Sequence, residues 1–171
     1  MIDLDFSVKK SKEPDEAWLL RVDDWLEVTE TLFLGDVVFS VDGMNFGVKN
    51  NYILAVADTL LTASDALVFY EEDIQIGYPE QPQNLLFQRQ GKQAIISLVS
   101  NGETQQEASA DLLVMCREIG KFSRRVIWRL FQEYPKLMNN QKLFATRCRH
   151  ADLHLYYYAL INNPLLCRSL F

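Results

Sequence analysis

The sequence predicts a single α+β domain over residues 1–171, with helices packed against an antiparallel sheet of about six to seven short strands and two helices at the C-terminus. Three observations lead to this class. Short β-rich runs separated by turn dipeptides fill the first hundred residues, an apolar segment interrupts them, and the last third repeats apolar residues every three or four positions. With 49% apolar residues in 171, the chain is long enough to bury a substantial core.

Residues 2–8 alternate apolar and polar side chains, which predicts a strand with one buried face. From Trp25 to Val48 the sequence indicates strands separated by turns at Gly35-Asp36 and Asp42-Gly43. Asp-Gly favours a tight hairpin because both central residues of a type I′ turn need positive φ. We therefore expect a three-stranded antiparallel meander in this region.

The segment Tyr52–Leu61 is apolar on most sides, so we expect a buried helix across that sheet, capped by Asn50-Asn51. A second group of strands follows it. Short β-like runs occur at Ile74–Ile76, Leu85–Phe87 and Ala94–Val99, the last two joined near Gly91.

A long helix is expected between Asp111 and Tyr134, before Pro135. Its core face repeats at three and four and comprises Leu112, Cys116, Ile119, Ser123, Val126 and Leu130. Its opposite face is basic and comprises Arg117, Lys121, Arg124, Arg125 and Arg129. A final helix is expected over about Ala145–Ile161.

Charge is divided unevenly along the chain. Residues 1–80 hold 17 Asp and Glu with 5 Lys and Arg, whereas residues 81–171 hold 6 with 12. An acidic half attracts basic protein surfaces and repels nucleic acid. We therefore expect a protein partner with a basic surface, and neither a nucleic acid nor a membrane.

The residues expected to contact this partner are acidic groups that steer association and two aromatic anchors. They are Asp23, Asp24, Glu27, Glu30, Asp36, Glu71, Glu72, Asp73, Trp128 and Tyr157. For the basic helix face we rank solvation or internal pairing first, a protein interface second and a nucleic-acid site third.

No residue pattern predicts a catalytic centre, and no cofactor is expected. His150 and His154 have the i, i+4 spacing of two zinc ligands, but Ala151 stands where HExxH needs its glutamate, and no further ligand is indicated. The three cysteines are far apart and are expected to be free thiols. Because no signal sequence or run of about 18 apolar residues is evident, we expect a cytoplasmic protein.

The hairpin Val37–Phe46 followed by the helix Tyr52–Leu61, and the later strands Leu85–Val99 before the helix from Asp111, resemble small bacterial proteins of unknown function. The same layout is similar to some immunity proteins of polymorphic or contact-dependent toxin systems. The resemblance implies a cytoplasmic antidote that binds one toxin and has no catalytic residues.

These observations favour a non-catalytic bacterial immunity or inhibitor protein that neutralises its toxin by stoichiometric binding. Two alternatives stay open at this level. One is a self-associating scaffold, such as a homodimer, in which acidic and basic halves of two copies meet. The other is a metal-dependent enzyme using His150 and His154.

Overall fold

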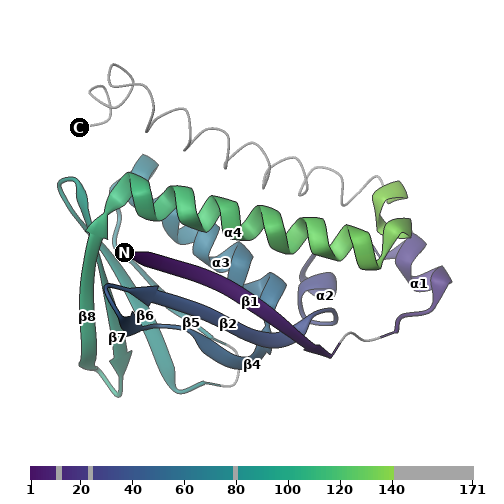
Figure 1. Cartoon of the computed structure of the whole chain (residues 1–171), viewed down its shortest axis with the longest axis horizontal. Coiled ribbons are helices and arrows are strands. Elements are labelled where there is room, and N and C mark those ends of the chain that lie inside the picture. Colours follow the sequence, from purple (N-terminus) through teal and green to yellow (C-terminus); the bar gives the residue numbers. More distant parts are fainter. Residues whose placement is uncertain (11–12, 23–24, 79–80, 141–171) are drawn as a thin grey trace.

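The computed structural model describes residues 1–10, 13–22, 25–78 and 81–140. Within these residues the protein is α+β, as predicted, but its strands form two antiparallel sheets of four strands rather than one sheet (Figure 1). The first sheet contains β1 (Ile2–Lys10), β2 (Leu34–Val41), β3 (Met44–Asn45) and β4 (Val48–Tyr52). The second contains β5 (Ile74–Gly77), β6 (Gln83–Gln90), β7 (Gln93–Ser100) and β8 (Glu103–Asp111). The helical segments are α1 (Glu16–Arg21), α2 (Trp25–Thr29), α3 (Ile53–Asp65), η1 (Ala66–Tyr70), α4 (Leu112–Glu133) and η2 (Pro135–Asn139).

The first sheet is built around β2, which pairs with β1 on one side and with β3 and β4 on the other. The predicted hairpin is confirmed, because Asp42 and Gly43 have φ of 50° and 85° as a type I′ turn requires. Between β3 and β4 the chain passes so close to β2 that a Cβ on Gly47 would lie 2.3 Å from the Val37 carbonyl oxygen. Glycine at this position therefore allows both segments to pair with β2.

The prediction of strand structure from Trp25 onward is wrong at its start, because Trp25–Thr29 forms α2. Its Trp, Val and Thr residues favour strands locally, but as a helix the segment buries Val28 and Thr29. A further short helix, α1, was not expected; its N-cap is Asp15, whose carboxylate accepts a hydrogen bond from the Trp18 backbone N–H at 2.7 Å.

The expected buried helix is confirmed as α3 and continues into a π-helical turn, η1. Its capping was predicted wrongly: the N-cap is Tyr52, which provides no side-chain cap, and the Asn51 side chain accepts from the Tyr52 N–H instead. The span Ile53–Tyr70 is long and apolar enough to cross a membrane by composition, and 61% of it is buried inside this fold.

The second sheet has the order β5-β6-β7-β8. Three of its strands were predicted, whereas β8 was missed because Glu103–Asp111 lacks regular apolar alternation. A turn signal precedes it nevertheless: Asn101 and Gly102 have φ of 52° and 80° and connect β7 to β8 as a tight hairpin.

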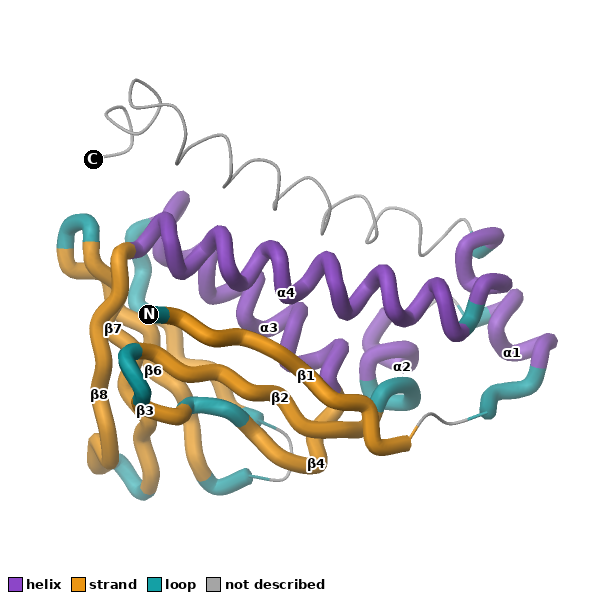
Figure 2. Tube along the Cα trace, in the orientation of Figure 1, coloured by secondary structure: helices purple, strands orange, loops and turns teal. Residues whose placement is uncertain are grey.

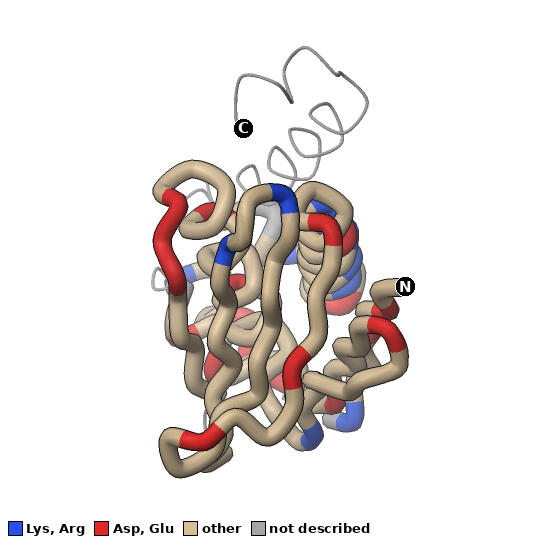
Figure 3. Tube along the Cα trace, turned by 90° about the vertical axis from the view of Figure 1, so that its left-hand side faces the viewer, with Lys and Arg blue, Asp and Glu red and all other residues tan. Residues whose placement is uncertain are grey.

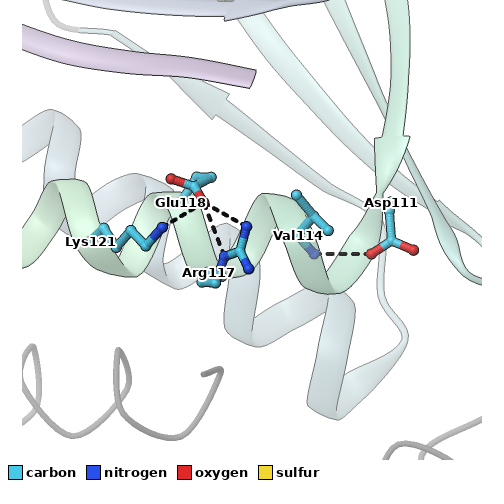
Figure 4. A network of polar contacts seen from close by, with 5 residues as sticks. All are labelled: Asp111, Val114, Arg117, Glu118 and Lys121. Carbon is cyan, nitrogen blue, oxygen red and sulfur yellow. Dashed lines mark hydrogen bonds and ion pairs between the residues drawn. The ribbon is translucent and has the colours of Figure 1, made fainter. Parts of the chain in front are cut away.

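The long predicted helix is confirmed as α4, and its six predicted core residues are buried. Asp111 caps it by accepting a hydrogen bond from the Val114 N–H at 3.0 Å (Figure 4). After α4, Pro135 begins the 3₁₀ turn η2. The final helix expected over 145–161 lies outside the described residues.

One continuous hydrophobic core joins both sheets and the helices. The rings of Phe39 in β2 and Phe87 in β6 stack with centroids 6.4 Å apart, and Phe46 contacts Phe39 at 5.8 Å. Helices α3 and α4 lie over the sheets on one side of the molecule (Figure 2). The outer face of the second sheet is left uncovered by the described helices (Figure 1).

Candidate protein-binding surface

An exposed aromatic and acidic segment follows the end of α3. In this segment, here called the acidic knuckle (Phe69–Asp73), Phe69 is 42% and Tyr70 69% exposed. Glu71, Glu72 and Asp73 are exposed directly after them. Large aromatic side chains in solvent, next to several carboxylates, form a surface typical of protein recognition.

The backbone of the acidic knuckle is held in place by Arg89 of β6, whose side chain is only 10% exposed. Its guanidinium donates to the Leu67 carbonyl at 3.1 Å and lies 3.3 Å from the Glu71 carboxylate. Glu71 adopts a left-handed conformation with φ of 54°, and the Glu72 N–H donates to the Ala66 carbonyl at 3.2 Å. The cation therefore satisfies a helix-end carbonyl and fixes the direction in which the chain leaves the helix.

The knuckle borders the uncovered face of the second sheet. Gln88 Nε2 donates to Asp73 Oδ2 at 2.8 Å, which connects β6 to the knuckle. Alternation along β6 and β7 places Leu85, Phe87, Ala94 and Ile96 in the core, so the intervening residues face outward. We call these outward positions of the second sheet the open face. Its centre is formed by Leu86, Ile95 and Val99 beside the buried Ser97, and Glu107 lies on the edge strand β8.

The open face is apolar at its centre and acidic at its rim. Leu86, Ile95 and Val99 are partly exposed, and Ser97 donates to Glu107 at 3.0 Å. Among the outward positions of the described strands β5–β8 there is no Lys or Arg. Figure 3 looks onto this face: its strands are mostly neutral, with acidic segments at the border and basic segments in β6, which holds Arg89, and at the β6–β7 turn, which holds Lys92.

The other predicted acidic contacts do not join this surface. Glu27 lies on α2 and Glu30 directly follows it. A few residues after Glu30, the Phe33 carbonyl accepts a hydrogen bond from the Ile53 N–H at the start of α3. The 18-residue helical span Ile53–Tyr70, about 27 Å long, thus lies between these acids and the knuckle. Glu27 also accepts a hydrogen bond from Trp18 Nε1 at 2.8 Å.

Asp36 is part of the sheet rather than a free surface charge. Its carboxylate lies 2.8 Å from Lys9 Nζ and accepts the Asn50 backbone N–H at 2.9 Å. These contacts, the Lys9 hydrogen bond first, lower the pKa of Asp36 below its ordinary value of 3.8. Asp36 therefore links β1, β2 and β4.

Trp128 is the one predicted aromatic anchor that falls within the described residues, and it is 65% exposed on α4. It lines a hollow of about 290 Å³ with Arg124 and Arg125. The remaining predicted residues Asp23, Asp24 and Tyr157, with His150 and His154, lie outside the described part of the chain.

Most of the basic face of α4 is internally paired, the arrangement ranked first from the sequence. Arg117 and Lys121 both contact Glu118, at 3.0 and 2.9 Å (Figure 4). Burial alone would raise the pKa of Glu118, but hydrogen bonds from these two cations lower it below 4.5. Arg129 pairs with Glu133 along the helix.

The described residues provide little reactive chemistry. Burial raises the pKa of the Cys116 thiol to about 12, so it is not an activated nucleophile at neutral pH. Over residues 1–140, outside the short undescribed segments, no three His, Cys, Asp or Glu side chains come together as a metal site. What this surface offers a ligand is charge, aromatic area and shape.

Sequence reasoning identified the carboxylates of the knuckle but missed Phe69 and Tyr70. The expected helix stopped at Leu61, so the aromatic pair was not assigned to any element. Their position directly before Glu71-Glu72-Asp73 was the available signal. The apolar centre of the open face was missed because an outward position follows only from strand register.

Comparison with known protein families, with curated proteins and with solved structures found no match.

Proposed function

We propose that this protein is a non-catalytic binding domain whose acidic knuckle and open face together bind one basic protein partner. The observation that carries the proposal is the exposed Tyr70 beside three carboxylates, on a backbone held by Arg89. A rigid aromatic anchor next to an acidic rim loses little conformational entropy on binding and attracts a basic surface.

The two parts of the surface have different roles in this proposal. Tyr70 and the aliphatic centre exclude water and hold the complex together, which governs dissociation. Glu71, Glu72 and Asp73 remain at the rim, where charges mainly raise the association rate. The expected partner has a basic rim around an apolar depression.

The most concrete form of this function is a cytoplasmic bacterial immunity or inhibitor protein. Toxins that act on nucleic acid are often basic, and an acidic inhibitor is steered onto them at up to about 10⁸–10⁹ M⁻¹s⁻¹ at low salt. The resemblance in strand and helix order supports this form. The protein encoded beside this chain is the first partner to test.

The test compares two charge-matched variants of the full chain. E71Q/E72Q/D73N removes three charges at the knuckle, and E13Q/E27Q/E30Q removes three near α1 and α2 at the other end of α3. At low salt we expect the knuckle variant to associate at least about tenfold more slowly with the partner, whereas the α2-end variant associates like the wild type. Stopped-flow measurements at several salt concentrations give these rates.

Tyr70→Ala provides a second arm, with dissociation expected to be about 30-fold faster and association little changed. Equal slowing by both charge variants would show that only overall charge matters. No effect of either charge variant or of Tyr70→Ala on the rates would exclude the surface.

A further inference from the structure

A basic and aromatic patch on α4 complements the open face in charge and in apolar character. The α4 patch, defined as Arg124, Arg125 and Trp128, surrounds the hollow of about 290 Å³. Arg125 is held in position because it donates to the Leu4 carbonyl and lies 3.2 Å from Asp5 Oδ1. Within the described residues, Arg124 has no ion pair of its own.

The exposure of Trp128 is unusual for so large an apolar ring. Its neighbours on the core side, Val126, Ile127 and Leu130, are buried, so α4 is already anchored without it. A tryptophan between arginines on an otherwise polar helix face is the composition of an interface centre. A surface that binds this patch must therefore be apolar at its centre and carry acidic groups around it.

We propose that the α4 patch of one copy docks on the open face of a second copy. Trp128 would cover the aliphatic centre formed by Leu86, Ile95 and Val99. Arg124 would meet acidic residues of the rim, at the knuckle or at Glu107, while Arg125 keeps its contact with Asp5 and adds positive charge beside it. This pairing buries apolar surface that each copy otherwise exposes, and it opposes unlike charges.

The two faces point in different directions on one copy. Figure 3 looks onto the open face and along the axis of α4, so residues on the outer side of this helix project sideways from that view. The contact is therefore head-to-tail: each bound copy keeps one unused face, and assembly continues to a ring or a filament.

This inference does not rest on the proposed partner, because the two copies supply both surfaces. The two functions compete, since the same open face serves both. Self-association would cover the acidic face when the basic partner is absent, and a stronger basic partner would displace the neighbouring copy.

The experiment is sedimentation velocity on the full chain at about 20 mM and about 500 mM salt. We expect the wild type to form a concentration-dependent series of oligomers at low salt that dissociates at high salt. Two variants, here called the blocked variants, each impair one side of the contact: E71Q/E72Q/D73N removes acidic charges at the rim of the open face, and R124Q/W128A removes side chains of the α4 patch. Each should associate at least about tenfold more weakly.

Mixing the two blocked variants is the decisive arm. Each supplies the surface that the other lacks, so we expect their mixture to form a 1:1 complex that grows no further. Arg117→Gln is the matched control, because it removes a charge from α4 without touching the patch, and it should assemble like the wild type. Thermal unfolding verifies that each variant is folded.

Either of two results would overturn the proposal. One is a wild-type protein that stays monomeric at low salt up to about 1 mM. The other is a mixture of the blocked variants that forms no 1:1 complex while the wild type assembles, because the contact would then involve other surfaces.

Discussion

Asp36 shows how contacts within the fold determine the role of an acidic residue. From its place in an acidic stretch it was assigned to partner binding, yet its carboxylate is used by Lys9 and by the Asn50 N–H. A sequence contains no information on which lysine lies across a strand pair. Tyr70 is the opposite case, because its exposure depends on the π-helical turn that contains it.

We predict that the carboxyl of Asp36 titrates below pH 3.8 in the folded protein, because Lys9 and the Asn50 N–H favour its ionised form. A lowered pKa means that this contribution to stability is present above the unfolded-state value and is lost as pH falls through the folded-state value. NMR titration of the Asp side chains measures it. Lys9→Gln should move the pKa of Asp36 upward, and an unchanged value in that variant would contradict the assigned cause.

At the scale of elements, the sequence predicted those whose pattern is locally complete. Helix α4 has a three-and-four apolar repeat, an N-cap at Asp111 and a stop at Pro135, and it was predicted with nearly correct bounds. Strand β8 has no apolar alternation, because one of its faces is solvated and the other presents small alanines. Helix α2 is too short for a periodic signal, so tertiary burial decided its structure.

The Asp111 cap is predicted to stabilise the junction between β8 and α4. Asp111→Ala should lower the free energy of unfolding by about 1 kcal/mol, because the Val114 N–H loses its partner. Asp111→Asn keeps an acceptor oxygen and should retain most of this stability. Urea denaturation of the three proteins measures the difference, and equal losses in both variants would show that charge, rather than the hydrogen bond, is responsible.

At the scale of the whole molecule, the sequence predicted the α+β class but not the division into two sheets. That division depends on which strands pair across loops, and neither composition nor periodicity specifies it. In three dimensions, the acidic first half of the chain also does not form one continuous acidic surface. Acidic residues of the first half lie at both ends of α3, and only those beside β5 border the open face.

The shared core predicts that both sheets unfold together. Phe87→Leu in the second sheet should reduce the free energy of unfolding by about 1–2 kcal/mol, since it removes the ring stacked on Phe39. All three tryptophans, Trp18, Trp25 and Trp128, lie outside the second sheet. Their fluorescence and the circular dichroism signal should shift to the same lower urea midpoint, whereas a shift in circular dichroism alone would show that the sheets unfold separately.

The π-helical turn at the end of α3 has a consequence at the level of the gene. Such a turn holds one residue more than an α-helical turn, so side chains beyond it are rotated by about 100°. In η1 this rotation accompanies a change from the buried Leu67 and Val68 to the exposed Tyr70. A one-codon deletion within Ala66–Tyr70 would therefore redirect the aromatic anchor while leaving the composition of the core nearly unchanged.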